Sequence, residues 1–122
     1  MTDAVVLRPV IWVGSSRRDF RAFPDGVKDQ MGYALFVAQQ GGKHPDAKPL
    51  KGFGGASIVE IVRDYRGDTY RAVYTVRFAG SVCVLHAFQK KSKTGRATPK
   101  FVMDLIARRL REAEHIARGE IR

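Results

Sequence analysis

Alternating apolar and polar residues are the clearest pattern in the chain, and they predict three strands in its middle third. The three runs are ASIVEIVRDY, DTYRAVYTVRF and SVCVLHAFQK. Such alternation is typical of strands, and the gaps around Gly67 and Gly80 are short enough for hairpin turns. We therefore predict an antiparallel meander.

The flanking segments predict the rest of an α+β fold. VVLRPVIWVG, at residues 5 to 14, reads as a strand, and Pro9 places it at an edge or a bulge. A helical hairpin follows, and the Pro- and Gly-rich residues 44 to 56 predict a loop. Thr98 as N-cap and Pro99 at the first helical position begin the last helix. Its expected buried residues are Phe101, Leu105, Ile106, Leu110, Ala113 and Ile116.

The expected architecture is one α+β domain spanning residues 1 to 122. An N-terminal edge strand joins the three-stranded meander into one sheet, with the helical hairpin between them and a helix at the C-terminal end. A chain of 122 residues is long enough for one core and too short for two ordinary domains.

Charge and cysteine content limit the partners, location and cofactors that we expect for this protein. The chain has 22 Lys and Arg against 12 Asp and Glu, a net charge of +10, which favours a polyanion or an acidic protein as partner. No apolar run approaches the length of a membrane span, and no signal-peptide pattern is present, so we expect a cytoplasmic protein with no membrane partner. Lone Cys83 and scattered His44, His86 and His115 give no zinc spacing, so no metal or small-molecule cofactor is expected.

Two-residue turns at both hairpins would sort the strand residues onto two faces of the sheet. One face would be almost wholly apolar: Val59, Ile61, Ala72, Tyr74, Val76, Cys83, Leu85 and Ala87. The opposite face would be mixed: Ile58, Glu60, Val62, Arg71, Val73, Thr75, Arg77, Val82, Val84, His86, Phe88 and Lys90. Acid, imidazole, guanidinium and an aromatic ring would then lie together beside a lysine.

These residue types can cut RNA without a metal, because a base must deprotonate a ribose 2′-hydroxyl while cations stabilise the phosphoryl oxygens. Arg71 suits the phosphate, Glu60 or His86 could move protons, and Phe88 could hold an unstacked base. The remaining basic candidates are Lys90, on this face of the sheet, and Lys51, Arg63, Arg77, Lys93 and Arg96 for nucleic-acid binding. The plainer interpretation is a cross-strand ion pair, a packed histidine and a solvated basic loop.

Several segments also resemble a known family. PLKGFGG, EIVRDYRGDTYRAVYTV, VLHAFQKKSKTGRATP and the closing helix are similar to the phage-derived HigB-like branch of the RelE/ParE toxin superfamily. The resemblance implies a RelE-like microbial RNase fold and a toxin of a type II toxin-antitoxin pair. Such a toxin cuts mRNA on the ribosome without a metal and is neutralised by its antitoxin.

The resemblance carries over to single residues only in part. It implies that Arg71 matches the phosphate-binding arginine of the family and that Lys90 and Lys91 lie where the family has cations near the scissile phosphate. RelE proper has lysines where Glu60 and Val62 stand here, and it has a C-terminal tyrosine, whereas no Tyr follows Tyr74. The general base therefore stays open between Glu60 and His86.

Two other functions fit the same sequence. A ParE-type toxin that inhibits DNA gyrase would need no catalytic residues on the sheet. A basic module that only binds nucleic acid would rely on charge alone. If the chain is a toxin, its antitoxin partner should present an acidic surface to the basic residues of the mixed face.

Overall fold

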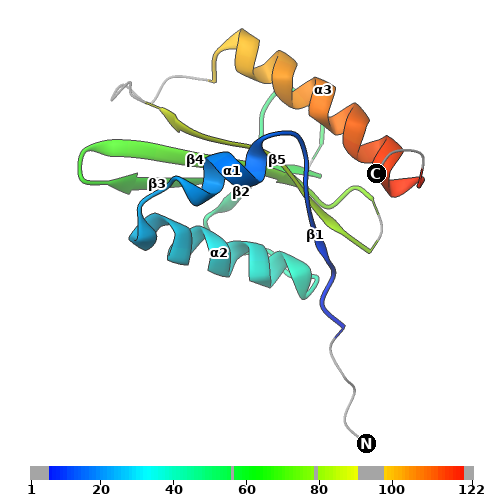
Figure 1. Cartoon of the computed structure of the whole chain (residues 1–122), viewed down its shortest axis with the longest axis horizontal. Coiled ribbons are helices and arrows are strands. Elements are labelled where there is room, and N and C mark those ends of the chain that lie inside the picture. The colour runs from blue at the N-terminus through cyan, green and yellow to red at the C-terminus, as the bar shows by residue number, and fades with distance from the viewer. Residues whose placement is uncertain (1–5, 56, 79, 91–97, 120–122) are drawn as a thin grey trace, which may run out of the picture.

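The computed structural model describes residues 6–55, 57–78, 80–90 and 98–119. Within them the chain forms a five-stranded mixed sheet in the order β1-β5-β4-β3-β2. The strands are β1 (Val10–Trp12), β2 (Ala47–Pro49), β3 (Ile58–Tyr65), β4 (Asp68–Thr75) and β5 (Val82–Lys90). The helices are α1 (Ser16–Arg21), α2 (Asp25–Gln39) and α3 (Lys100–Ala117). Helix α2 runs along one face of the sheet and α3 along the other (Figure 1).

The first hairpin confirms its predicted register. Tyr65 pairs with Asp68, so Arg66 and Gly67 alone form the turn. Both turn residues have positive φ, 52° and 87°. Two consecutive left-handed residues match the right-handed twist of the flanking strands, which is why glycine suits the second position.

The second hairpin differs from the prediction. β4 ends at Thr75, which pairs with Cys83, and the register shifts between the pairs Val73–His86 and Tyr74–Val84. Leu85 is therefore an extra residue in β5, a β-bulge that reverses the facing of every residue before it. The connection between the strands is six residues long, not two.

Because of this bulge, the predicted facing of the first half of β5 was wrong. Cys83 and Leu85 pack in the core beneath α3, whereas Val82 and Val84 pack in the core beneath α2. From His86 onward the predicted register holds, because Ala72 pairs with Ala87 and Arg71 with Phe88.

Two further details of the predicted fold were wrong. β2 lies inside the expected loop and pairs antiparallel with β3, Ala47 opposite Ile61, so the sheet has a fifth strand. Helix α3 begins at Lys100 with Pro99 as its N-cap residue, and Phe101 is 76% exposed while Val102 is buried. Strand β1 lies at the edge of the sheet as predicted, but it is shorter than the expected residues 5 to 14 and begins directly after Pro9.

The sheet separates two apolar cores. The α2-side core contains the buried helix positions that the sequence spacing predicted: Val27, Met31, Ala34, Leu35 and Ala38. The α3-side core is smaller, and α3 contributes Val102, Ile106 and Ala113 to it. Among the described residues, no helix is both long enough and apolar enough to cross a membrane.

Candidate functional site

Arg71 of β4 lies on the α3-side face, where the sheet pairs it with Val62 of β3 and Phe88 of β5. Its Nη1 donates a hydrogen bond to Glu60 Oε2 at 3.1 Å. The two side chains are only 11% and 18% exposed. Arg71 Nε is buried and has no hydrogen-bond partner among the described residues. A buried guanidinium N–H without an acceptor is uncommon in folded proteins, and such unsatisfied donors are found at binding and catalytic sites.

A cavity of about 280 Å³ adjoins this ion pair and is called the Arg71 cavity below. It is lined by Lys48, Pro49, Leu50, Lys51, Glu60, Arg71, Thr98 and Met103. The two lysines come from β2 and the turn after it, which pairing with β3 brings beside Glu60. Three basic groups thus surround one carboxylate, which favours an anionic ligand.

Lys90 and Phe88 continue the same face of the sheet. Lys90 pairs with Thr69, two residues along β4 from Arg71, and Lys90 is 9% exposed. Diagonal neighbours of this kind have Cβ atoms about 7–8 Å apart, within reach of a long side chain. The structure therefore brings Glu60, Arg71, Phe88 and Lys90 together on one face, as the sequence predicted. Lys51, a predicted nucleic-acid-binding residue, lines the Arg71 cavity with Glu60 and Arg71.

Other predicted binding residues lie elsewhere. Arg63 is opposite Tyr70, a residue of the α2-side core, and pairs with Asp46 at 2.6 Å. Arg77 is exposed in the connection after β4 and donates to Ser57 Oγ at 3.2 Å, at the far end of the strand from Lys90. Lys91, Lys93 and Arg96 are outside the described residues.

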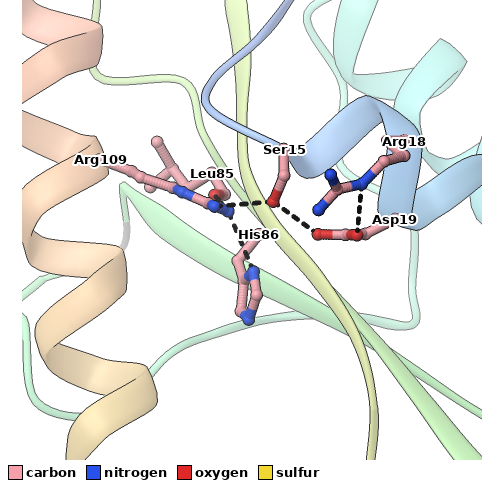
Figure 2. A network of polar contacts seen from close by, with 6 residues as sticks. All are labelled: Ser15, Arg18, Asp19, Leu85, His86 and Arg109. Carbon is pink, nitrogen blue, oxygen red and sulfur yellow. Dashed lines mark hydrogen bonds and ion pairs between the residues drawn. The ribbon is translucent and has the colours of Figure 1, made fainter.

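His86 lies on the same face as Arg71 but belongs to a separate polar network (Figure 2). Arg109 of α3 donates to Leu85 O at 2.9 Å, to His86 Nδ1 at 3.1 Å and to Ser15 Oγ at 2.8 Å. Ser15 in turn donates to Asp19 Oδ2 at 2.7 Å. One arginine thus joins α3, the bulge of β5 and the start of α1.

The network determines the chemical state of His86. A guanidinium is always a donor, so Nδ1 must accept and the neutral ring carries its proton on Nε2. Burial and the Arg109 charge lower the pKa of His86 from 6.5 to about 4, against a smaller opposing effect of Asp19. The imidazole is therefore neutral at pH 7 and a weak base.

The sequence reasoning missed Arg109, Ser15, Asp19 and Lys48. Arg109 follows Ile106 by three residues on the buried side of α3, and a cation at that spacing among apolar residues was the available signal. In the structure Gly14 has a φ of +57°, and a Cβ there would lie 2.6 Å from Arg109 Nε, so Arg109 packs against a position that suits only glycine. Within the described parts of the chain, no three His, Cys, Asp or Glu side chains gather closely enough to hold a metal ion.

A family model and solved structures are similar to this chain. The model of the family described as "Phage derived protein Gp49-like (DUF891)" matches residues 18–111. A double mutant of the E. coli toxin RelE in the free state has a similar structure, with a TM-score of 0.53 and 16% identity over 87% of this chain and 97% of RelE. The Mycobacterium tuberculosis toxin-antitoxin complex RelBE2 also matches, with a TM-score of 0.46 and 20% identity over 75% of this chain and 100% of that chain. No curated protein sequence is significantly similar.

The family match covers most of the chain, and the RelE structure aligns with nearly its whole length. The family match agrees with the phage-derived family that the sequence resembles, and the RelE structure agrees with the fold that this resemblance implies. The chain belongs to the phage-derived Gp49-like family and has a RelE-like fold.

Proposed function

We propose that this protein is the toxin of a type II toxin-antitoxin pair, a ribosome-dependent endonuclease that cuts mRNA in the cytoplasm without a metal. The observation that supports this most directly is a buried arginine, Arg71, with an unused N–H donor beside a basic cavity. A guanidinium can hold two oxygens of one phosphate, and Lys48 and Lys51 add positive charge around them.

In the proposed reaction the ribose 2′-oxygen attacks the adjacent phosphorus. The new O–P bond closes a 2′,3′-cyclic phosphate, and the bond from phosphorus to the 5′-oxygen breaks. Arg71 and the neighbouring lysines stabilise the charge that gathers on the phosphoryl oxygens. The 2′-hydroxyl proton passes to the general base, and the departing 5′-oxygen takes up a proton from water and leaves as a hydroxyl group.

Glu60 is the better supported general base. Its Oε2 accepts only the Arg71 bond among the contacts of the described residues, and both groups line the same cavity. A phosphate that binds Arg71 takes over this donor and releases the carboxylate next to the reacting ribose. His86 is less suitable because its Nδ1 already accepts from Arg109 and its pKa is about 4.

The proposed partners follow from charge. A net charge of +10 favours binding to ribosomal and messenger RNA, and an antitoxin that covers the Arg71 cavity should do so with acidic residues.

The test is cleavage by purified protein. Ribosomes programmed with a defined mRNA are incubated with wild-type protein, and new 5′ ends are mapped by primer extension. New ends that carry a 5′-hydroxyl support the proposal. Intact mRNA together with inhibited DNA supercoiling would indicate a gyrase inhibitor, and RNA binding without new ends would indicate a module that only binds.

A further inference from the structure

A second cavity lies between α1 and the edge of β5, and the proposed reaction leaves it unused. Its volume is about 470 Å³, within the range of small-molecule sites. Its lining residues are Asp19, Ala22, Phe23, Pro24, Tyr70, His86, Ala87, Phe88 and Gln89. β1 pairs with β5 only as far as Val84, so this part of the β5 edge has no neighbouring strand among the described residues.

The lining is rich in flat rings. His86 and Phe88 stack on each other with centroids 4.9 Å apart and planes 17° from parallel. Phe23 and Tyr70 form an edge-to-face pair at 5.0 Å. Partly exposed rings such as those of His86 and Phe88 are the usual platforms for unstacked nucleobases, because every base has an aromatic face. Phe23 and Tyr70 lie behind them, buried in the α2-side core.

Asp19 supplies an acceptor in a fixed orientation. Its Oδ2 accepts from Ser15, which Arg109 holds in turn, and its Oδ1 accepts from the neighbouring Arg18 Nε at 3.5 Å. Each carboxylate oxygen can accept two hydrogen bonds, so both keep capacity for a ligand. A carboxylate next to aromatic rings fits a planar ligand that carries N–H donors.

We propose that this cavity, lined by Asp19, His86 and Phe88, binds a nucleobase with an exocyclic amino group, whose N–H donors bond to the Asp19 carboxylate. The inference rests on the proposed RNA substrate and names the base that lies next to the cleaved link. Phe88 lines this cavity and pairs across the sheet with Arg71, so the base site is one strand away from the phosphate site. Uracil is disfavoured because it presents a carbonyl oxygen, an acceptor that the carboxylate repels, where cytosine presents its amino group.

The test measures binding, not cleavage, with ligands matched for size. The affinities of the full-length protein for 3′-CMP and 3′-UMP are compared by calorimetry, because these nucleotides differ at the amino-bearing position of the ring. We expect CMP to bind about tenfold more tightly, the gain typical of one well-placed hydrogen bond to a charged group. The pair 3′-AMP and 3′-IMP should show the same preference for the amino group.

Two variants connect the preference to the cavity. Asp19→Asn should reduce the CMP-to-UMP ratio to less than about threefold, whereas Asp104→Asn, an exposed carboxylate of α3, should leave it unchanged. Phe88→Leu should weaken the binding of both nucleotides about equally and keep the CMP-to-UMP ratio, because it removes the stacking ring and leaves the acceptor in place. Phe88→Leu also provides a second test of the cavity if Asp19→Asn does not fold.

The outcomes separate this inference from the proposed function. Equal affinity for the amino and keto nucleotides, or a ratio that survives Asp19→Asn in a folded protein, would overturn the base site even if the protein cuts mRNA. Selective nucleotide binding by a protein that produces no new RNA ends would retain the base site and reject the nuclease.

Discussion

Two arginines reach the α3-side face of the sheet, and their hydrogen bonds differ. Arg109 donates to a backbone carbonyl, a histidine and a serine, so its donors hold α3, β5 and α1 together. Arg71 donates to Glu60 alone among the described residues, and its Nε has no partner there. A guanidinium whose donors are used within the fold acts as a clamp, whereas a buried donor without a partner beside a cavity indicates a candidate binding site.

Arg63 shows that the unused donor is not sufficient by itself. Its Nε also lacks a partner among the described residues, yet it pairs with Asp46 and lies on the opposite face of the sheet from Arg71. Neither of the two cavities described above is lined by it. The combination of unused donor, neighbouring cations and cavity distinguishes Arg71.

Replacing Arg71 should have the largest effect. Arg71→Gln removes the charge at the proposed phosphate site, so cleavage of ribosome-bound mRNA should fall about 10³-fold, near the upper end for loss of one stabilising donor. Arg63→Gln is the matched control, a strand arginine with one carboxylate partner, and should stay within about threefold of wild type. Comparable rates for the two variants would remove Arg71 from the mechanism.

Glu60→Gln should lower the cleavage rate about 10²-fold, because an amide cannot take the 2′-hydroxyl proton. Asp64→Asn is the control, since Asp64 lies on the same strand and bonds to Thr69 at 2.8 Å. Single-turnover cleavage of the same mRNA measures both. A larger loss in His86→Gln than in Glu60→Gln would instead identify His86 as the base.

Arg109→Met should lower the free energy of unfolding by about 2 kcal/mol, because it leaves the Leu85 carbonyl and the Ser15 hydroxyl without their donor. Urea unfolding measures this change in the free energy of unfolding. Arg108→Met, at an exposed neighbouring position, should change it by less than about 0.5 kcal/mol. Equal effects of both substitutions would show that the clamp is not needed for stability.

The sequence was enough to predict the parts of the fold that depend on local pattern. Period-two alternation located the meander, and the Arg66–Gly67 turn set the register that brings Glu60 and Arg71 together. Helical spacing predicted the buried face of α2. These features depend on residues close in sequence.

The missed features depend on contacts between distant segments. The bulge at Leu85 leaves no mark in a run of apolar residues, because both faces of that half of β5 are buried. β2 is three residues long and contains Pro49, so only its pairing with β3 makes it a strand. Arg109 was missed because its partners Ser15 and His86 are 94 and 23 residues away in sequence.

The smallest predicted effect is the pH dependence of stability that follows from His86, whose pKa is lowered by burial and then by the Arg109 charge. The folded-state pKa of about 4 lies below the unfolded value of about 6.5, so the unfolded chain binds more protons between these values. The stability contributed by the neutral ring is therefore complete above pH 6.5 and is lost as the pH falls toward 4. Allowing for partial exposure, the loss should be about 1 kcal/mol. The measurement is urea unfolding of the wild type and of His86→Gln at pH 7.5 and 4.5. The carboxylates titrate in both proteins, so the difference between their losses of stability gives the contribution of His86. A His86 ring that titrates near pH 6.5 by NMR would contradict the prediction, and a rise in its pKa in Arg109→Met would assign part of the shift to the clamp.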